Sequence, residues 1–235
     1  MYATISADIV SSTTLSIDET IALKKKINDQ FVSLSCKFPG FWGRLIKGDY
    51  IECLVPNPSA ALRIALILKT LVKSFDIERT KKNKQFSTYG IRIAIGVGEM
   101  RIIDRNEDIM DGEAIYRSGR SLSKMGTPSK GTMTIDMYDA RLLQSLRTIT
   151  LLVDALLNSA TRRQSEVLHY KLMSLNENEI ASIMCMKQSA INQHSTAAKW
   201  YCIEAALKYF ETLDFYGYAS YSMVADEPVR FTRRR

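Results

Sequence analysis

Short apolar runs and longer amphipathic runs alternate along the first half of the chain. The runs YATISADIV (2–10) and YGIRIAIGVGEM (89–100) are rich in β-branched residues and predict strands. Residues 17–38 have helical spacing, and SAALRIALILKTLVKSF (59–75) is apolar on nearly all sides, which indicates a helix buried against a sheet. With the shorter runs beside them, the predicted order is β-α-β-β-α-β-α-β. This order is typical of an α+β, ferredoxin-like fold with an extra strand.

Turn and capping residues mark the ends of these elements. Ser16 begins the sequence SIDE, which has the spacing of a capping box before the first helix. Asn57 and Pro58 suit the N-cap and first position of the second helix. Gly48 and Asp49 separate two β-rich runs, FWGRLIK and YIECLV, and so predict a hairpin.

Helical periods replace the strand signal from Tyr138 onward and continue to Phe215. We therefore expect an α+β domain over residues 1–137 and an all-α domain over 138–216. Residues 217–235 end in RFTRRR and are expected to form a basic tail.

The stretch LNENEIASIMCMKQSAINQHSTAAKW (175–200) resembles the helix-turn-helix of bacterial repressors and sigma factors. Such a motif needs a small residue where two helices cross, a role for Ala181, and apolar residues that lock the pair together. Relatives usually carry glycine where Cys185 stands, because the turn often needs a positive φ. Cysteine there costs about 1 kcal/mol of strain or implies a slightly different turn. The residues expected to face the core are Ile180, Met184, Met186 and Ile191.

The second helix of this pair has a polar outer side that suits base edges and phosphates. An alternative is a plain helical hairpin that mediates dimerisation or contacts another protein. The residues expected to contact DNA are Lys187, Gln188, Ser189, Asn192, Gln193, His194 and Lys199.

Composition narrows the possible functions. The net charge of the 235 residues is +7, which favours a polyanionic partner. Only two histidines are present, so histidine-rich metal sites and Ser-His-Asp catalysis are disfavoured. The four cysteines are scattered in apolar runs and are expected to be buried free thiols. No membrane span or signal peptide is evident, so we expect a cytoplasmic protein with no membrane partner.

The stretch ADIVSSTTLS (7–16) ends a strand at an acid and a cluster of hydroxyls. If the first strand lies beside the hairpin, Asp8 and Asp49 converge, and paired carboxylates suit Mg²⁺ or Mn²⁺. Ser11, Ser12 and Thr13, lying before a helix, would then bind a polyphosphate. The alternative is that Asp8 is a cap and Asp49 a turn residue.

Four segments together, ADIVSST, GRLIKGDYIECLV, IRIAIGVGEM and DGEAIYRSGRSL, resemble the catalytic domain of class III nucleotidyl cyclases over residues 2–136. The resemblance implies that Asp8 and Asp49 bind the metal ions, that Arg120 stabilises the transferring phosphates, and that the protein is a homodimer. Leu45 and Tyr116 stand where the family has its base-selecting lysine and ribose-orienting asparagine. The whole chain is also similar to small bacterial SatD-type proteins.

These observations support two hypotheses of different classes. The first is a transcriptional regulator that binds double-stranded DNA and senses a nucleoside triphosphate or cyclic nucleotide through a diverged cyclase-like domain. The second is an active cyclase that forms a 3′,5′-cyclic nucleotide from a triphosphate. A weaker third reading treats the first half as a dimerisation scaffold without a nucleotide.

Overall fold

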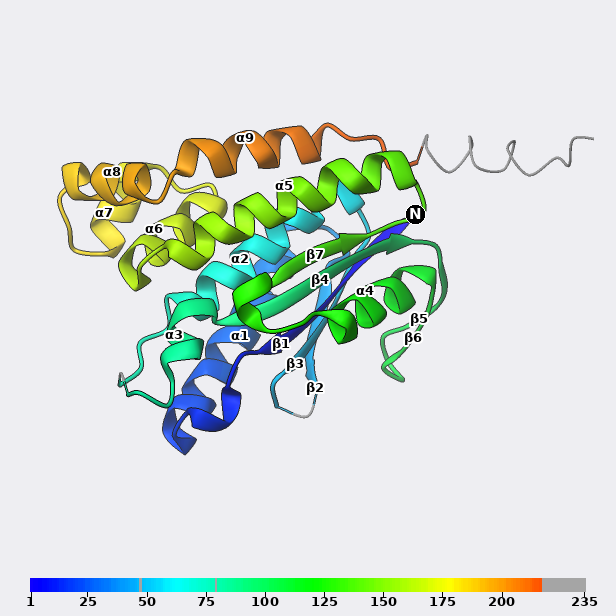
Figure 1. The fold of residues 1–235 in the computed structure, drawn as a ribbon, viewed down its shortest axis with the longest axis horizontal. Helices are drawn as coiled ribbons and strands as arrows, with labels where there is room; N and C mark the ends of the chain where they lie inside the picture. Colours follow the sequence, from blue (N-terminus) through cyan, green and yellow to red (C-terminus); the bar gives the residue numbers. More distant parts are fainter. Residues whose placement is uncertain (47, 79, 217–235) are drawn as a thin grey trace, which may run out of the picture.

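A five-stranded sheet forms the centre of the first half of the molecule (Figure 1). The computed structural model describes residues 1–46, 48–78 and 80–216. The strand order is β2-β3-β1-β4-β7; β4 and β7 are parallel and the other neighbours are antiparallel. The strands are β1 (Tyr2–Ile9), β2 (Trp42–Ile46), β3 (Tyr50–Val55), β4 (Ile91–Gly98) and β7 (Met133–Asp136). A separate two-stranded ribbon pairs β5 (Met100–Asp104) with β6 (Ile109–Gly112).

Helices cover both faces of this sheet. Helices α1 (Ile17–Lys37) and α2 (Ala61–Lys73) lie on one face, and α4 (Glu113–Lys124) lies on the other (Figure 1). Strand β1 shows the alternation behind this arrangement: Ala3, Ile5 and Ala7 belong to the apolar core, and the residues between them face α4. A short helix, α3 (Lys84–Tyr89), precedes β4.

Helix α4 contacts the sheet through small and polar groups. The Ser118 hydroxyl lies 2.8 Å from the Thr4 hydroxyl and 2.9 Å from the Ser6 hydroxyl, all of them buried. A Cβ on Gly96 would lie 2.2 Å from the Ala114 carbonyl oxygen, so only glycine permits this approach. The close packing fixes the outward side chains of α4 relative to β4 and the ribbon.

From Ala140 to Glu211 the elements are all helices, but their core is shared with the sheet. The helices are α5 (Ala140–Ser159), α6 (Arg162–Leu172), α7 (Glu177–Ile183), α8 (Gln188–Ala197) and α9 (Trp200–Glu211). Leu146, Leu172 and Phe210 belong to the same buried cluster as the sheet residues. The predicted boundary after residue 137 thus marks the end of the strands while the core continues across it. A separately folding unit at 138–216 stays a prediction.

The predicted α+β architecture and the early element order are confirmed. The capping box predicted at Ser16 forms with Glu19, and further capping boxes form at Thr161 with Gln164 and at Asn176 with Glu179. The sequence interpretation did not include α3 or the β5–β6 ribbon. The basic tail lies outside the described residues.

The predicted burial of the cysteines was wrong for three of the four. Cys53 is buried, whereas Cys36, Cys185 and Cys202 are exposed, and all four are free. Cys36 and Cys202 each lie beside the buried stripe of their helix, because the stripes run through Leu34 and Ile203. No helix among the described residues has the length and apolarity that crossing a membrane requires.

Candidate functional site

The backbone brings Asp8 and Asp49 together as the sequence predicts. Strand β1 pairs with β3, and Asp8 lies opposite Tyr50. The Ile9 N–H donates to the Asp49 carbonyl at 3.1 Å, so the hairpin turn adjoins the end of β1. The convergence of the two chain segments is confirmed.

The two carboxylates have different partners in the chain. Arg92 of β4 lies opposite Asp8, and its guanidinium donates to both Asp8 oxygens, with a distance of 2.9 Å from Nε to Oδ1. The Asp49 carboxylate accepts a hydrogen bond of 2.9 Å from the Ser12 hydroxyl. Among the described residues, no group of three or more His, Cys, Asp or Glu side chains could hold a metal ion. As these side chains lie, they do not fit a two-carboxylate metal site, because an ion would have to take Asp8 from Arg92. Metal binding at Asp8 and Asp49 stays a prediction.

The hydroxyl cluster forms a tight turn between β1 and α1. Ser11 has a left-handed backbone, with φ of 54°, and precedes a single 3-10 turn formed by Ser12, Thr13 and Thr14. The N-terminus of α1 lies beyond this turn and is capped by Ser16. The hydroxyls therefore do not lie directly at a helix N-terminus, and phosphate binding by Ser11, Ser12 and Thr13 stays a prediction.

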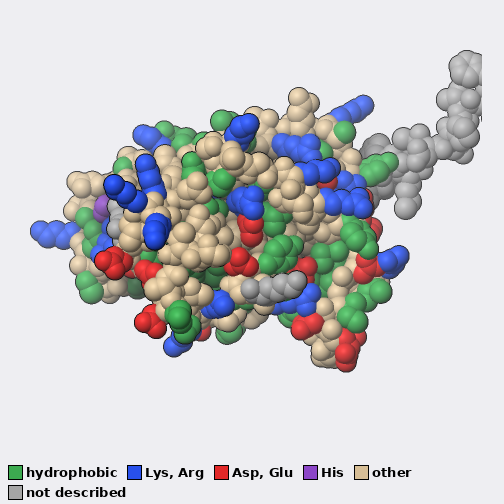
Figure 2. All heavy atoms as spheres, turned by 60° about the horizontal axis from the view of Figure 1, so that its bottom comes forward, with side chains coloured by type: hydrophobic (Ala, Val, Ile, Leu, Met, Phe, Trp, Pro, Cys, Tyr) green, Lys and Arg blue, Asp and Glu red, His purple; other side chains and the backbone are tan. Residues whose placement is uncertain are grey.

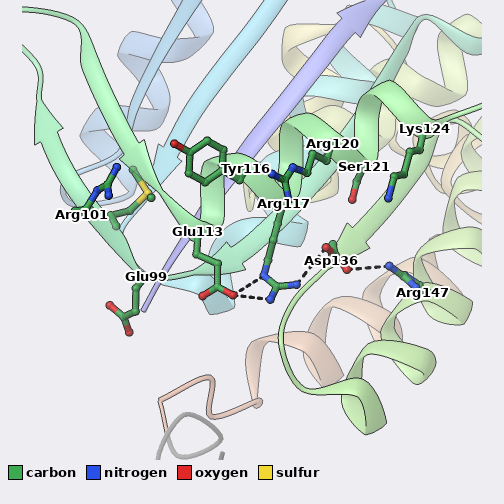
Figure 3. A pocket seen from close by; sticks show the side chains of 12 residues that line it. Glu99, Arg101, Glu113, Tyr116, Arg117, Arg120, Ser121, Lys124, Asp136 and Arg147 are labelled. Atoms are coloured by element: carbon green, nitrogen blue, oxygen red, sulfur yellow. Dashed lines mark hydrogen bonds and ion pairs between the residues drawn. The ribbon is translucent and has the colours of Figure 1, made fainter.

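Arg120 lies on the outer side of α4 and lines a cavity of about 660 Å³ between this helix, the β5–β6 ribbon and the end of β7 (Figure 3). Its guanidinium carbon is 5.7 Å from the centre of the Tyr116 ring, a cation–π arrangement. Arg120 has no carboxylate partner within the described part of the chain. An unpaired guanidinium beside an exposed aromatic ring can bind a phosphate while a base stacks on the ring.

The ribbon is tied to α4 by a polar cluster at one wall of this cavity. The Tyr116 hydroxyl donates to the Asp111 carboxylate at 2.6 Å, and Arg101 also donates to Asp111. Hydrogen bonds from Tyr116 and Arg101 lower the pKa of Asp111. Asp111 in turn raises the pKa of Tyr116, because an anion disfavours a second anion beside it. Tyr116 thus holds the ribbon in place.

Asp136 at the end of β7 joins two arginines at the opposite wall. Arg117 of α4 lies 3.3 Å from one Asp136 oxygen and also pairs with Glu113, and Arg147 of α5 lies 2.8 Å from the other oxygen (Figure 3). Arg147 donates to the Ile135 carbonyl as well, at 3.1 Å. The sequence interpretation missed this group, since its members lie on three different elements.

Helices α7 and α8 pack around a small core of their own with α6. Ile180, Ala181, Ile191 and Val167 form a buried cluster, and Met184 and Met186 pack against it partly buried. This confirms the predicted inward side of the pair. Cys185 in the connecting turn has a φ of 53°, so the turn does adopt the left-handed backbone that favours glycine.

The polar side of α8 faces away from this small core. Of the residues predicted to contact DNA, His194 is half-buried and the other six are exposed: Lys187, Gln188, Ser189, Asn192, Gln193 and Lys199. Lys199 also has a left-handed backbone, with φ of 59°, and is the N-cap residue before α9. The structure thus places all seven side chains on or beside one helix.

Glu177, at the start of α7, interacts with this polar surface. It accepts a hydrogen bond from Lys171 at 3.1 Å. This bond, with smaller effects of the nearby Asn192 and Gln188 side chains, lowers the pKa of Glu177. The carboxylate therefore lies close to two amides that the sequence assigns to DNA reading. Glu177 was not predicted, although its position at the first turn of α7 is visible in the sequence.

A buried ionic network lies between α2, β7 and α5. Lys69 and Asp154 form a salt bridge of 3.0 Å and are both shielded from solvent. Asp154 also accepts from the Thr132 N–H and hydroxyl, both at 2.6 Å. Nearby, burial lowers the pKa of Lys73 to about 7. The network links the first half of the chain to the helical half through their common core.

Comparisons with known proteins find distant likenesses among solved structures. No protein-family model matches the chain, and no curated protein matches it. The chain is similar to a bacterial light-regulated adenylyl cyclase, with 15% identity over 57% of this chain and 42% of that one, and a TM-score of 0.39. It is also similar to the guanylyl cyclase Cya2, with 14% identity over 60% of this chain and 76% of that one, and a TM-score of 0.38. The chain spans less than half the length of the light-regulated cyclase. Likenesses at this level assign neither family nor activity.

Proposed function

We propose that this protein is a DNA-binding regulator that reads duplex DNA with α8 and binds a nucleotide through its first half. The observation that carries the proposal is the exposed row of Gln188, Ser189, Asn192 and Gln193 on a helix anchored from behind by buried Ile191. Amide and hydroxyl side chains of this kind hydrogen-bond base edges in the major groove.

Cations at both ends of α8 suit the phosphates that flank a groove. Lys187 precedes the helix and Lys199 follows it, and both are exposed. Phosphate contacts of this type position a reading helix without specifying sequence. A homodimer would place two such helices about 34 Å apart, or a multiple of it, on one side of the duplex.

The test is fluorescence anisotropy with duplexes selected from a randomised pool by the full-length protein. We expect Asn192→Ala to weaken binding by about 1–3 kcal/mol, roughly five- to 150-fold. Lys187→Gln should reduce the slope of log K against log salt concentration by about one. Asn178→Ala, at an exposed asparagine of α7, is the matched control and should bind normally. Unchanged binding by Asn192→Ala would remove α8 as the reading helix, and failure to select any duplex would remove the proposed DNA-binding function.

The nucleotide part of the proposal rests on Arg120 beside Tyr116 in the cavity between α4, the β5–β6 ribbon and β7, which we call the α4 cavity. Calorimetry with each of the four ribonucleoside triphosphates and Mg²⁺, together with product chromatography, separates a sensor from an enzyme. Binding without product, weakened in Arg120→Gln, supports a sensor. A cyclic product that disappears in Asp49→Ala would instead establish the cyclase alternative, and the absence of binding would overturn the nucleotide assignment.

A further inference from the structure

A second cavity, of about 350 Å³, opens between the C-terminal end of α4, the 125–131 loop and α5. We call it the α4–α5 cavity. Three cations line it, Lys124 from α4, Lys130 from the loop and Arg147 from α5, and no Asp or Glu is among its lining residues. It adjoins the larger α4 cavity, because Ser121, Lys124 and Arg147 line both.

The three cations differ in how they are neutralised. Neither Lys124 nor Lys130 has a carboxylate partner within the described part of the chain. Arg147 is paired with Asp136, but its side chain is still 52% exposed. Figure 2 shows a dense group of Lys and Arg side chains on one part of the face drawn, whereas cations and acids are mixed elsewhere on that face. Three cations on one concave surface repel one another, and an anion between them removes this repulsion.

The walls of the cavity suit a phosphate group. The loop between α4 and β7 has the sequence GTPSKG, and Gly126 has open space where a Cβ would lie. Thr134 and Ser121 add hydroxyls to the lining. Small residues allow an oxyanion to approach the backbone, and lysine and arginine donate charge-assisted hydrogen bonds to it.

We propose that the α4–α5 cavity is a binding site for a phosphate-bearing anion, held by Lys124, Lys130 and Arg147. Asp136 is the competing carboxylate at this site, since it holds the Arg147 guanidinium at 2.8 Å when no other anion is bound. The proposal extends the nucleotide part of the proposed function to a neighbouring subsite, because Lys124 and Arg147 line both cavities. Binding of a phosphate here does not require Arg120, Asp8, Asp49 or a metal ion.

The test is isothermal titration calorimetry of the full-length protein with pyrophosphate in Mg²⁺-free buffer containing EDTA. We expect binding that weakens about tenfold in Lys124→Gln and in Arg147→Gln, because each removes a charge-assisted hydrogen bond. Asp136→Asn should bind more tightly, since it removes the competing charge. Arg141→Gln, an exposed arginine of the same helix α5, is the matched control and should bind normally. Lys124, Arg141 and Arg147 are exposed, so their substitutions are not expected to affect folding.

Two further measurements identify the source of the phosphate. A nucleoside triphosphate that binds more tightly than tripolyphosphate, with the difference lost in Tyr116→Ala, supports the site and assigns a nucleotide that extends into the larger cavity. Equal affinities support the site and assign a free polyphosphate. Absence of pyrophosphate binding, or binding that is unchanged in Lys124→Gln and Arg147→Gln, would overturn the proposal. DNA binding by α8 is measured separately, so its loss and the loss of this site are distinguishable.

Discussion

Asp8 and Arg92 lie opposite each other on neighbouring strands, and the Arg92 guanidinium donates to both oxygens of the Asp8 carboxylate. This hydrogen bonding to Asp8 raises the pKa of Arg92. The chain itself thus supplies the positive charge that the sequence interpretation assigns to a metal ion at Asp8. The pair is about one quarter exposed, so it is open to competition from solutes.

We therefore expect Mg²⁺ to bind Asp8 well only when Arg92 is absent. The parent protein should show no change in its free energy of unfolding with millimolar Mg²⁺. In Arg92→Gln, a Mg²⁺ concentration a few times above the Kd for Mg²⁺ should raise the free energy of unfolding by about 1 kcal/mol. Urea denaturation with and without Mg²⁺ measures this difference, and Arg92→Gln combined with Asp8→Asn should lose it. Stabilisation of the parent by Mg²⁺ would instead support the metal site predicted from the sequence.

The buried pair of Lys69 and Asp154 should contribute strongly to stability. Asp154→Asn leaves a buried ammonium group without its counter-charge, which typically costs about 3–5 kcal/mol. The control is Asp139→Asn at the N-cap of the same helix, where asparagine caps about as well as aspartate. Chemical denaturation followed by circular dichroism compares the two. A cost below about 1 kcal/mol for Asp154→Asn would show that the ionic form of this pair is unimportant.

His169 should make the protein less stable in weak acid. Burial lowers the pKa of His169 to about 4 from 6.5, and its Nδ1 lies 3.3 Å from the Ile67 carbonyl oxygen. Between these values the unfolded chain binds a proton that the folded protein does not, so stability falls as the pH decreases from 6.5 to 4. The shift corresponds to about 3 kcal/mol for this group.

The measurement is the loss of unfolding free energy between about pH 7 and pH 4, compared in the parent and His169→Gln. The variant should lose less stability over this range, because glutamine does not titrate. The control variant His194→Gln, on α8, keeps the buried imidazole of His169. It should lose as much stability as the parent over this range. Equal losses in the parent and His169→Gln would contradict the assignment.

Cys185→Gly should stabilise the turn between α7 and α8. A left-handed backbone costs a residue with a Cβ about 1–2 kcal/mol, and glycine avoids most of this strain while adding flexibility to the unfolded chain. We expect a net gain of up to about 1 kcal/mol in thermal denaturation. Cys185→Ala removes the thiol but keeps the Cβ, so it should give no gain. If alanine and glycine stabilise equally, the thiol and not the backbone is responsible.

The candidate sites differ in how far the sequence could predict them. The inward side of the α7–α8 pair follows from the helical spacing of Ile180 and Ile191, and both are buried. The approach of Asp49 to β1 follows from pairing the hairpin with the first strand. The sequence pointed less clearly to the pairing of Arg92 with Asp8, since Arg92 is visible only as a lone cation within the apolar run IRIAI. The group formed by Arg117, Asp136 and Arg147 gave none, because its members come from three elements.

Local interactions explain what the sequence by itself determined. Strand alternation, helical spacing and the capping box at Ser16 depend on residues within about one turn of each other, and all are present in the structure. The tertiary structure alone decided which charges pair. Arg92 meets Asp8 across 84 positions, and Lys69 of α2 meets Asp154 of α5. With 32 lysines and arginines and 25 acids in the chain, spacing does not specify a partner. Sheet order and helix packing do, because they place the two side chains of each pair within reach. At Lys69 and Asp154 they also exclude the water that would otherwise solvate the charges.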